Sequence, residues 1–190
     1  TLFVYDDNGN LVKKIEGYFK NGKPIGNMKV TEFYANGKVK SKYQGALHDG
    51  KYHGYGKLVT YNKEGNKITS YTGKFKKGKY HGEGDLKVFA KSGKLKSRYV
   101  GNFKKGTYHG KGLYIAYDKN GKVYQKYKGK FKKGLFSGEG LLISYDKDGN
   151  VTSKYAGQFK KGTFEGSGIK VTYNKNGTIK SKYIGEFDGG

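Results

Sequence analysis

The chain has 190 residues, with 39 lysines and arginines against 15 aspartates and glutamates, so its net charge at neutral pH is +24. It has no cysteine, which excludes disulfide stapling, thiolate metal sites and cysteine catalysis. Its 33 glycines and single proline exclude a helical bundle, and none of its apolar runs is long enough to span a membrane as a helix. The 19 tyrosines supply the large rings that a folded core needs.

The chain is a tandem repeat with a period of 28 residues. A glycine that follows an aromatic residue by two positions recurs in register along the sequence. These glycines are Gly45, Gly73, Gly101, Gly129, Gly157 and Gly185. We therefore predict a single repeat array over residues 1–190, with about six full units, partial units at both ends and residues 15–42 as an atypical first unit.

Each unit predicts two strands and two turns, as residues 67–93 illustrate. Residues 67–75 form the first strand, 76–79 a tight turn, 80–89 the return strand and 90–93 a second turn. Asn-Gly or Asp-Gly occupies the second turn of other units, which favours a hairpin because glycine tolerates a positive φ. These dipeptides are Asn36-Gly37, Asn120-Gly121, Asp148-Gly149 and Asn176-Gly177. The fold class is therefore all-β, an elongated single-layer antiparallel meander of tandem hairpins.

One face of the predicted sheet is aromatic. In the first strand, Tyr71, Gly73 and Phe75 share one face and polar residues alternate with them, as in a half-buried strand. The return strand alternates less cleanly, because Tyr114 breaks the pattern. A bulge and a strand that is apolar on both faces are the two interpretations left open.

The repeat resembles the MORN repeat (membrane occupation and recognition nexus). The pattern Tyr-x-Gly-x-Phe-Lys-Lys-Gly-x-Tyr-His-Gly-x-Gly occurs at residues 71–84 and again at 99–112, and residues 20–38 resemble the bacterial variant of that repeat. The unit here is longer than is usual for that family, and Ser137 and Glu165 replace the family's histidine in later units. The resemblance implies a twisted, curved β ribbon with an aromatic-lined groove. It also implies a non-enzymatic scaffold, dimerisation arm or targeting module whose partners are proteins or anionic phospholipids.

The aromatic face is the first candidate binding site. Because a single sheet has no second layer to cover it, we expect some ring surface to stay exposed along a groove that suits an extended ligand, such as a peptide of a partner protein. The alternative is that these rings are simply the core. The predicted groove residues are Tyr71, Phe75, Tyr99, Phe103, Tyr127, Phe131, Tyr155 and Phe159.

Lysine pairs at the tight turns form the second candidate site. They recur once per unit, and several lysines together bind an anionic bilayer or another polyanion usefully. The alternative is that they solvate a thin sheet and protect its edges. With Arg98 as the sole arginine, we do not expect nucleic acid as a partner. The predicted polyanion-binding residues are Lys76, Lys77, Lys104, Lys105, Lys132, Lys133, Lys160 and Lys161.

The sequence predicts neither catalysis nor a metal site. No Ser/His/Asp set recurs and no two carboxylates are spaced for acid–base work. His53, His81 and His109 recur once per unit, about 10 Å apart along the sheet, which is too far for neighbours to share one ion. We therefore expect no catalytic residue, no metal and no cofactor.

The leading hypothesis is a non-enzymatic binding and scaffolding module with a protein partner. The alternatives are an electrostatic binder of anionic membrane or cell-surface polyanions and a targeting appendage of a larger enzyme. Self-association through unpaired terminal strands also stays open. The sequence identifies no compartment. Its lysine- and asparagine-rich, cysteine-free composition is typical of a bacterial source, either extracytoplasmic or membrane-associated, with a cytoplasmic location as the alternative.

Overall fold

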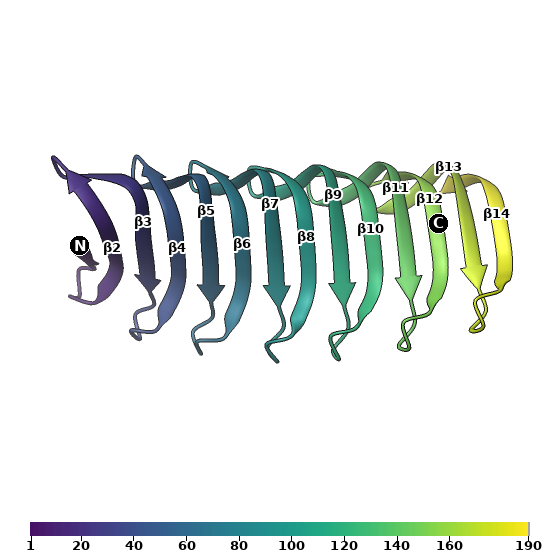
Figure 1. Cartoon of the computed structure of the whole chain (residues 1–190), viewed down its shortest axis with the longest axis horizontal. Coiled ribbons are helices and arrows are strands. Elements are labelled where there is room, and N and C mark those ends of the chain that lie inside the picture. Colours follow the sequence, from purple (N-terminus) through teal and green to yellow (C-terminus); the bar gives the residue numbers. More distant parts are fainter. Residues whose placement is uncertain (190) are drawn as a thin grey trace. The chain divides into compact units, whose positions relative to one another are not determined.

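The structure, a computed structural model, describes residues 1–189, and its regular elements are all β-strands (Figure 1). The chain divides into two compact units, Thr1–Gly93 and Lys94–Gly190, which we call the first unit and the second unit from here on. The 28-residue repeats within them are called repeats. The first unit holds β1 Leu2–Tyr5, β2 Leu11–Lys20, β3 Lys23–Phe33, β4 Val39–His48, β5 Lys51–Tyr61, β6 Lys67–Lys76 and β7 Lys79–Phe89. The second unit holds β8 Leu95–Lys104, β9 Thr107–Tyr117, β10 Val123–Lys132, β11 Leu135–Tyr145, β12 Val151–Lys160, β13 Thr163–Tyr173 and β14 Ile179–Asp188.

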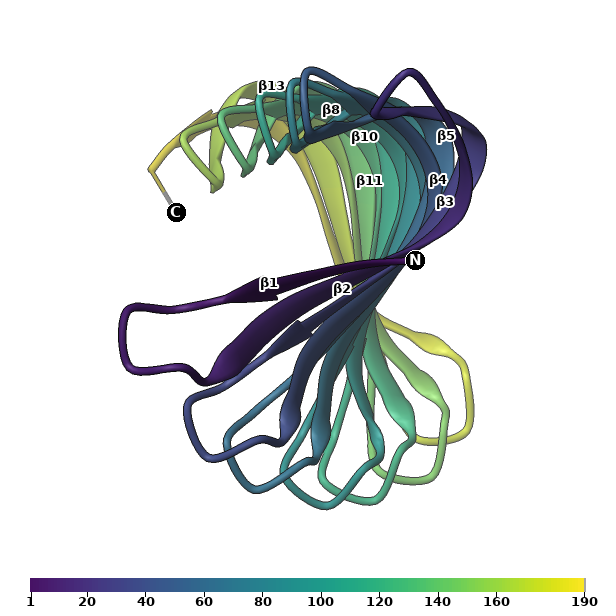
Figure 2. The ribbon, with the colours of Figure 1, turned by 90° about the vertical axis from the view of Figure 1, so that its left-hand side faces the viewer.

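Each unit is an antiparallel meander in which the spatial order of the strands follows their order in the sequence. Short turns join the strands at one end and longer turns join them at the other (Figures 1 and 2). The predicted all-β antiparallel meander is confirmed, and β6 and β7 match the predicted strands 67–75 and 80–89 to within a residue. That residues 1–190 act as one array stays a prediction. Within residues 1–189 no helix is long and apolar enough to cross a membrane.

A bulge interrupts every return strand near a glycine. Phe75 pairs with Tyr80 and Gly73 pairs with Gly84, so residues 81–83 of β7 lie opposite the single residue between Gly73 and Phe75. Gly82 has a φ of 62°, a left-handed conformation that glycine adopts without steric cost. The bulge re-aims the rest of the strand, so that both the residue before it and those after it can face the same core.

The bulge resolves the irregular pattern of the return strands. In β9, Tyr114 pairs with Tyr99 and therefore lies on the aromatic face, whereas Leu113 and Ile115 lie on the opposite face, which we call the outer face. Both open interpretations thus hold for this strand. It contains a bulge, and beyond the bulge it is apolar on both faces.

The core of each unit is a chain of interlocking rings. Tyr127 stacks on Phe136 with ring centres 3.8 Å apart, and it meets the edge of Phe131 at 5.1 Å. Phe159, which belongs to the following repeat, meets the same tyrosine edge-on at 5.0 Å. These offset and edge-to-face contacts are the favourable geometries for aromatic pairs. Each tyrosine is therefore covered by its own hairpin and by the next one.

Paired glycines make room for each tyrosine. Gly129 and Gly140 pair across β10 and β11, and a Cβ on Gly140 would collide with the ring of Tyr127. The Tyr127 hydroxyl donates a hydrogen bond of 2.9 Å to the backbone carbonyl of Lys130. In the first hairpin the fully buried Met28 takes the place of the second glycine and lies against Gly17. In the atypical first repeat, residues 15–42, a thioether therefore fills the space that a tyrosine ring fills in the other repeats.

Candidate binding surfaces

The eight predicted groove residues are buried in the core. Their exposed fractions are 3% or less, so the expectation that part of each ring stays exposed is wrong for them. The reason is the ring interlock: a return-strand ring covers the flat face of each tyrosine, and the phenylalanine of the next repeat closes its edge. The structure brings together Tyr71 with Phe75, Tyr99 with Phe103 and Phe131, Tyr127 with Phe131 and Phe159, and Tyr155 with Phe159. Binding along this face stays a prediction, but other side chains would make the contacts.

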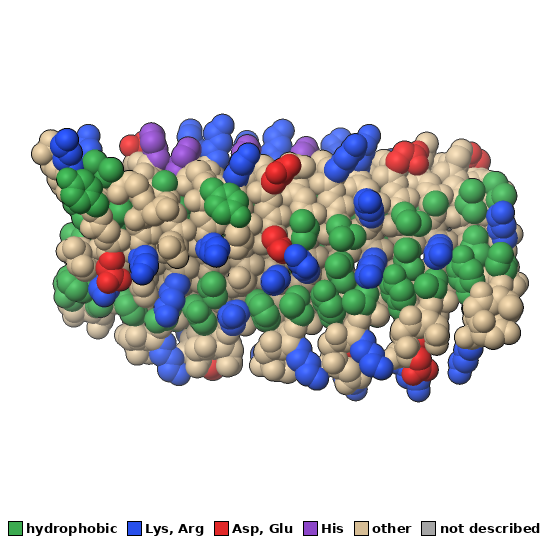
Figure 3. Space-filling view, in the orientation of Figure 1, with side chains coloured by type: hydrophobic (Ala, Val, Ile, Leu, Met, Phe, Trp, Pro, Cys, Tyr) green, Lys and Arg blue, Asp and Glu red, His purple; other side chains and the backbone are tan. Residues whose placement is uncertain are grey.

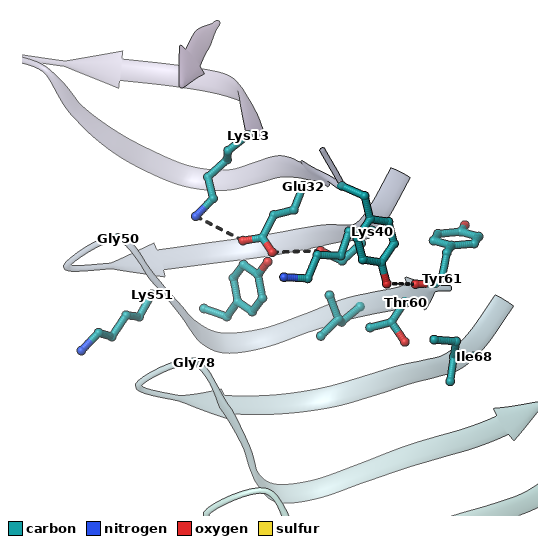
Figure 4. A pocket seen from close by; sticks show the side chains of 13 residues that line it. Lys13, Glu32, Lys40, Gly50, Lys51, Thr60, Tyr61, Ile68 and Gly78 are labelled. Carbon is teal, nitrogen blue, oxygen red and sulfur yellow. Dashed lines mark hydrogen bonds and ion pairs between the residues drawn. The ribbon is translucent and has the colours of Figure 1, made fainter. Parts of the chain in front are cut away.

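Hollows remain on the aromatic face among the described residues. In the second unit, Phe131 borders one of about 290 Å³ together with Tyr108, Tyr114 and Phe136. The first unit has one of about 390 Å³, bordered by Tyr52 and Leu58 with lysines at its rim (Figure 4). Small-molecule pockets span roughly 300–1,000 Å³, so both hollows lie near the lower end of that range.

The one carboxylate that lines the hollow of the first unit already has partners. Lys13 Nζ lies 3.1 Å from Glu32 Oε1, and the Ser41 hydroxyl donates to Glu32 Oε2 at 3.4 Å (Figure 4). Nearby, the Tyr34 hydroxyl donates to the backbone carbonyl of Tyr61 at 2.7 Å. An acid held in this way is poorly placed to act as a general base.

The core tyrosines are neutral at physiological pH. Burial raises the pKa of Tyr99 and of Tyr127 to about 12. Burial, followed by the nearby Glu32 carboxylate, raises the pKa of Tyr52 to about 12 as well. These hydroxyls therefore act as hydrogen-bond donors within the fold, and none of them is poised as a nucleophile or base.

The lysine pairs lie at two-residue turns of type I′ and are exposed. Lys76 pairs with Lys79, while Lys77 and Gly78 between them have φ values of 51° and 80°. The second lysine of each later pair is likewise in the left-handed region, which costs a residue with a Cβ about 1–2 kcal/mol. All eight predicted polyanion-binding lysines are exposed: Lys76, Lys77, Lys104, Lys105, Lys132, Lys133, Lys160 and Lys161.

Several short turns are tied to the repeat before them by a backbone hydrogen bond. The Gly78 N–H donates to the backbone carbonyl of Tyr52 at 2.9 Å, and the Gly134 N–H donates to that of Tyr108 at the same distance. These bonds recur in the second unit, where they hold the lysine pairs at regular intervals. Figure 3 shows lysines along the edge where the short turns lie, with the histidines beside them.

The histidines do not form a metal centre in the part of the chain that the structure describes. Residues 1–189 contain no group of three His, Cys, Asp or Glu side chains that could hold an ion. His48 and His53 lie with ring centres 5.3 Å apart, and both are at the end of the sheet that carries the short turns.

The outer face of the second unit carries a surface that sequence reasoning missed. A groove of about 680 Å³ is lined by the apolar residues Val100, Leu113 and Leu141 and by the charged residues Lys111, Lys128, Lys130 and Glu139. A second hollow of about 590 Å³ includes Ile169 and Ile184. A signal existed in the sequence: positions one period apart read Leu113, Leu141 and Ile169 in the second unit, but Lys29, Lys57 and Asp85 in the first.

Comparison with known proteins identifies the repeat. No curated protein matches the chain. A solved structure titled "Crystal Structure of TcdB2-TccC3-TEV" is similar over 96% of this chain, at 12% identity and with a TM-score of 0.23. This chain spans 13% of that much longer one.

The family models give the decisive match. The MORN repeat model matches residues 43–63, 71–87, 99–121, 127–149 and 155–176, which together are more than half of the chain. The MORN repeat variant model matches residues 26–44, most of which lie in the atypical first repeat, residues 15–42. The chain therefore belongs to the MORN repeat family.

Proposed function

We propose that this chain is a non-enzymatic binding and scaffolding module that holds a protein partner against its sheet. The observation that carries the proposal is the outer face of the second unit. There Leu141, Ile169 and Ile184, each more than a third exposed, lie on adjacent strands or one strand apart. Val100 is exposed to a similar extent, and Leu113 and Lys128 lie between it and Leu141. A contiguous apolar surface of this kind is typical of a protein–protein interface.

The chemistry of the remaining surface supports a binding role over an enzymatic one. The tyrosine hydroxyls donate to backbone carbonyls, as Tyr71 does to Lys74 at 2.8 Å and Tyr155 to Gln158 at 2.9 Å. Glu32, the acid at the hollow of the first unit, is paired with Lys13. These polar groups are thus committed to the fold.

Site-specific photo-crosslinking in the cells that make the protein tests this function. A photoreactive phenylalanine analogue at Ile169 should yield protein adducts of discrete mass, because this position lies within the exposed apolar surface. The same analogue at Thr72, on the polar outer face of the first unit, is the matched control. Adducts at neither position, or the same adducts at both, would contradict the proposal.

A second candidate function, polyanion binding, is supported by the turn lysines. Asn, Asp and Gly are the residues that type I′ turns favour, and Asn21 and Asp49 occupy the turn position in the first two hairpins. Lys77, Lys105 and Lys133 occupy the same position at a conformational cost. A positive charge retained where the backbone disfavours it supports a role for that charge.

Liposome co-sedimentation tests this second function with a variant that improves the fold. Asparagine at Lys77, Lys105, Lys133 and Lys161 removes four charges and relieves the turns. Binding to anionic but not neutral liposomes, weakened by salt and lost in this variant, is the expected result. A variant with asparagine at Lys76, Lys104, Lys132 and Lys160 removes the same charge without relieving the turns. Absence of binding at physiological salt would assign the lysines to solvation.

A further inference from the structure

The outer face carries a row of side chains that crosses every strand of the second unit. Because residues paired across antiparallel strands lie on the same face, the pairing defines the row from β8 to β14. Its members are Val100, Leu113, Lys128, Leu141, Ala156, Ile169 and Ile184, which we call the apolar row. The corresponding row of the first unit is polar throughout: Glu16, Lys29, Gln44, Lys57, Thr72 and Asp85.

The contrast between the units shows that the apolar row is not required by the fold. Both units build the same core on the opposite face, and the first unit does so with charged residues along this row. In Figure 3, hydrophobic side chains gather over the strands of the second unit, with lysines among them. The apolar row therefore serves something outside the chain's own core.

A row of cations borders the apolar row on the side of the longer turns. Arg98, Lys126, Lys154 and Lys182 lie on every second strand, and β-branched residues of the intervening strands separate them. Lys126 and Lys154 have their ammonium groups 5.5 and 5.6 Å from tyrosine ring centres, which helps to hold them in place. At a strand spacing of about 4.8 Å, the cations recur about every 10 Å.

The opposite border has mixed charge. Lys111 and Lys130 pair across β9 and β10, and Glu139 and Glu186 lie farther along toward β14. Only the border of the longer turns therefore has one sign of charge along its whole length. A partner is selected electrostatically at that border, where it must present negative charge.

We infer that the apolar row and its cation border bind an amphipathic helix of a partner protein that carries acidic residues at seven-residue intervals along one edge. This deepens the proposed function and rests on it. Seven strands span about 29 Å, which a helix of about 20 residues matches. Seven residues of helix advance about 10.5 Å, close to the spacing of the cations.

A helix fits this surface better than an extended peptide. The row runs across the strands, whose backbone groups already pair with one another. An extended peptide in the same place would leave its own backbone groups unpaired against apolar side chains, whereas a helix satisfies them internally. Side chains on one face of an extended peptide recur about every 6.6 Å, whereas those on one face of a helix recur about every 5.4 Å. The helical repeat is closer to the spacing of about 4.8 Å between the strands of the sheet.

A second copy of this chain is a poorer occupant. Two copies would each bring a charge of +24. An acidic helix instead brings complementary charge, and its contact with the cation border adds to the apolar contact.

A designed peptide tests this inference directly. The probe is a labelled synthetic helix of about 20 residues, with leucines along one face and glutamates at seven-residue intervals on one edge, and fluorescence anisotropy reports its binding to the full chain. We expect a micromolar Kd. We also expect at least a tenfold weaker affinity for the same peptide with lysine in place of glutamate.

Paired variants locate the binding surface. The double variant Leu141→Lys/Ile169→Lys should bind the glutamate peptide at least tenfold more weakly, because it places charges within the apolar row. The control Gln44→Lys/Thr72→Lys adds the same charge to the equivalent row of the first unit and should bind like the wild type. If the first variant proves poorly folded, Leu141→Ser/Ile169→Ser repeats the test with a milder change.

The outcomes separate this inference from the proposed function. Equal binding of the two peptides, wild-type affinity of the apolar-row variants, or no binding at 100 μM (about 5.5 kcal/mol) would each overturn the acidic helix. Crosslinks at Ile169 in the absence of peptide binding would leave the scaffold function standing with a different partner. If neither crosslinks at Ile169 nor peptide binding is observed, both the proposed function and the acidic-helix inference are rejected.

Discussion

In the four short turns that carry a lysine pair, the second lysine combines an unfavourable backbone with an exposed side chain. Lys133 has a φ of 52° and precedes Gly134, which is also in the left-handed region. Asparagine tolerates that region better than lysine because its short side chain can hydrogen-bond locally. The side chain of Lys133 makes no contact in the core, so its role in folding is confined to this backbone cost.

Lys133→Asn should stabilise the protein by about 0.5–1 kcal/mol. The physical reason is relief of the left-handed turn position, with a smaller gain from the removal of one positive charge. Urea unfolding measures the change. Lys132→Asn, next to it but outside the left-handed region, separates the two effects. If both variants gain equally, charge rather than backbone conformation is responsible.

Gly140→Ala should destabilise the protein by about 1–3 kcal/mol. Its backbone is not in the left-handed region, so the cost is the collision of the new methyl group with the Tyr127 ring. Thermal unfolding of this variant beside Glu139→Ala, an exposed neighbour on the same strand, measures it. A loss no larger than that of the control would show that the ring can move aside.

At the scale of the element, each hairpin is completed by the one that follows. Tyr155 stacks on Phe164 of its own hairpin at 3.9 Å and meets Phe187 of the next at 4.9 Å. Tyr183 contacts Phe187 on the same strand, β14, and is about half exposed; no return strand follows β14 within the described residues. The burial of a tyrosine therefore depends on its neighbouring repeat as much as on its own strand.

A double-mutant cycle measures this dependence. Phe159→Leu and Tyr127→Leu remove the two rings that meet edge-on across neighbouring repeats. Each change should be destabilising, and the coupling free energy should be about 0.5–1.5 kcal/mol. The pair Tyr155 and Phe187 offers a second instance of the same contact. Strict additivity would mean that the ring contact between repeats contributes nothing beyond burial.

Alkaline pH should unfold the protein between about pH 10 and 12. The pKa of Tyr99 and of Tyr127 is about 12 in the fold, because burial disfavours the charged ring, against an ordinary value near 10. A raised pKa contributes stability that is complete below the unfolded value and is lost as pH rises toward the folded one. Urea midpoints and tyrosinate absorbance across this range test it. Midpoints that stay constant up to pH 12 would contradict it.

Much of the element scale is readable from the sequence. The 28-residue period predicts strands and turns within a residue, because every unit repeats the same glycines and rings. The burial of Phe75 was not predictable from the pattern within one repeat. Phe75 is buried because it packs against Tyr43 of the preceding repeat. The outer position of Leu113 depends on a bulge at Gly110, which alternation alone does not reveal.

At the scale of the whole molecule, charge is the dominant feature. A net charge of +24 on 190 residues disfavours the compact state through self-repulsion. Few ion pairs offset it in the described part of the chain, and they lie near the surface, as between Lys160 and Glu165 at 2.7 Å. Specific ring packing therefore stabilises the fold against its own electrostatics.

Salt should raise the stability of the chain. Between low ionic strength and about 0.15 M the Debye length shortens to roughly 8 Å, which screens repulsion between successive lysine pairs. We expect the Tm to rise over that range in sodium chloride, as measured by circular dichroism. The asparagine variant at Lys77, Lys105, Lys133 and Lys161 should show a smaller rise. A Tm that falls with salt would indicate that attractive pairs dominate instead.

The separation of the ring core from the outer face has a consequence for how such a protein can change. A residue such as Thr72 or Ile184 can be exchanged without altering any ring contact, because its side chain leaves the sheet on the other side. Repeats of 28 residues thus share the same ring contacts with their neighbours but differ in the residues of their outer face. Duplication or recombination of repeats therefore changes the binding specificity of the outer face and leaves the ring contacts between repeats unchanged.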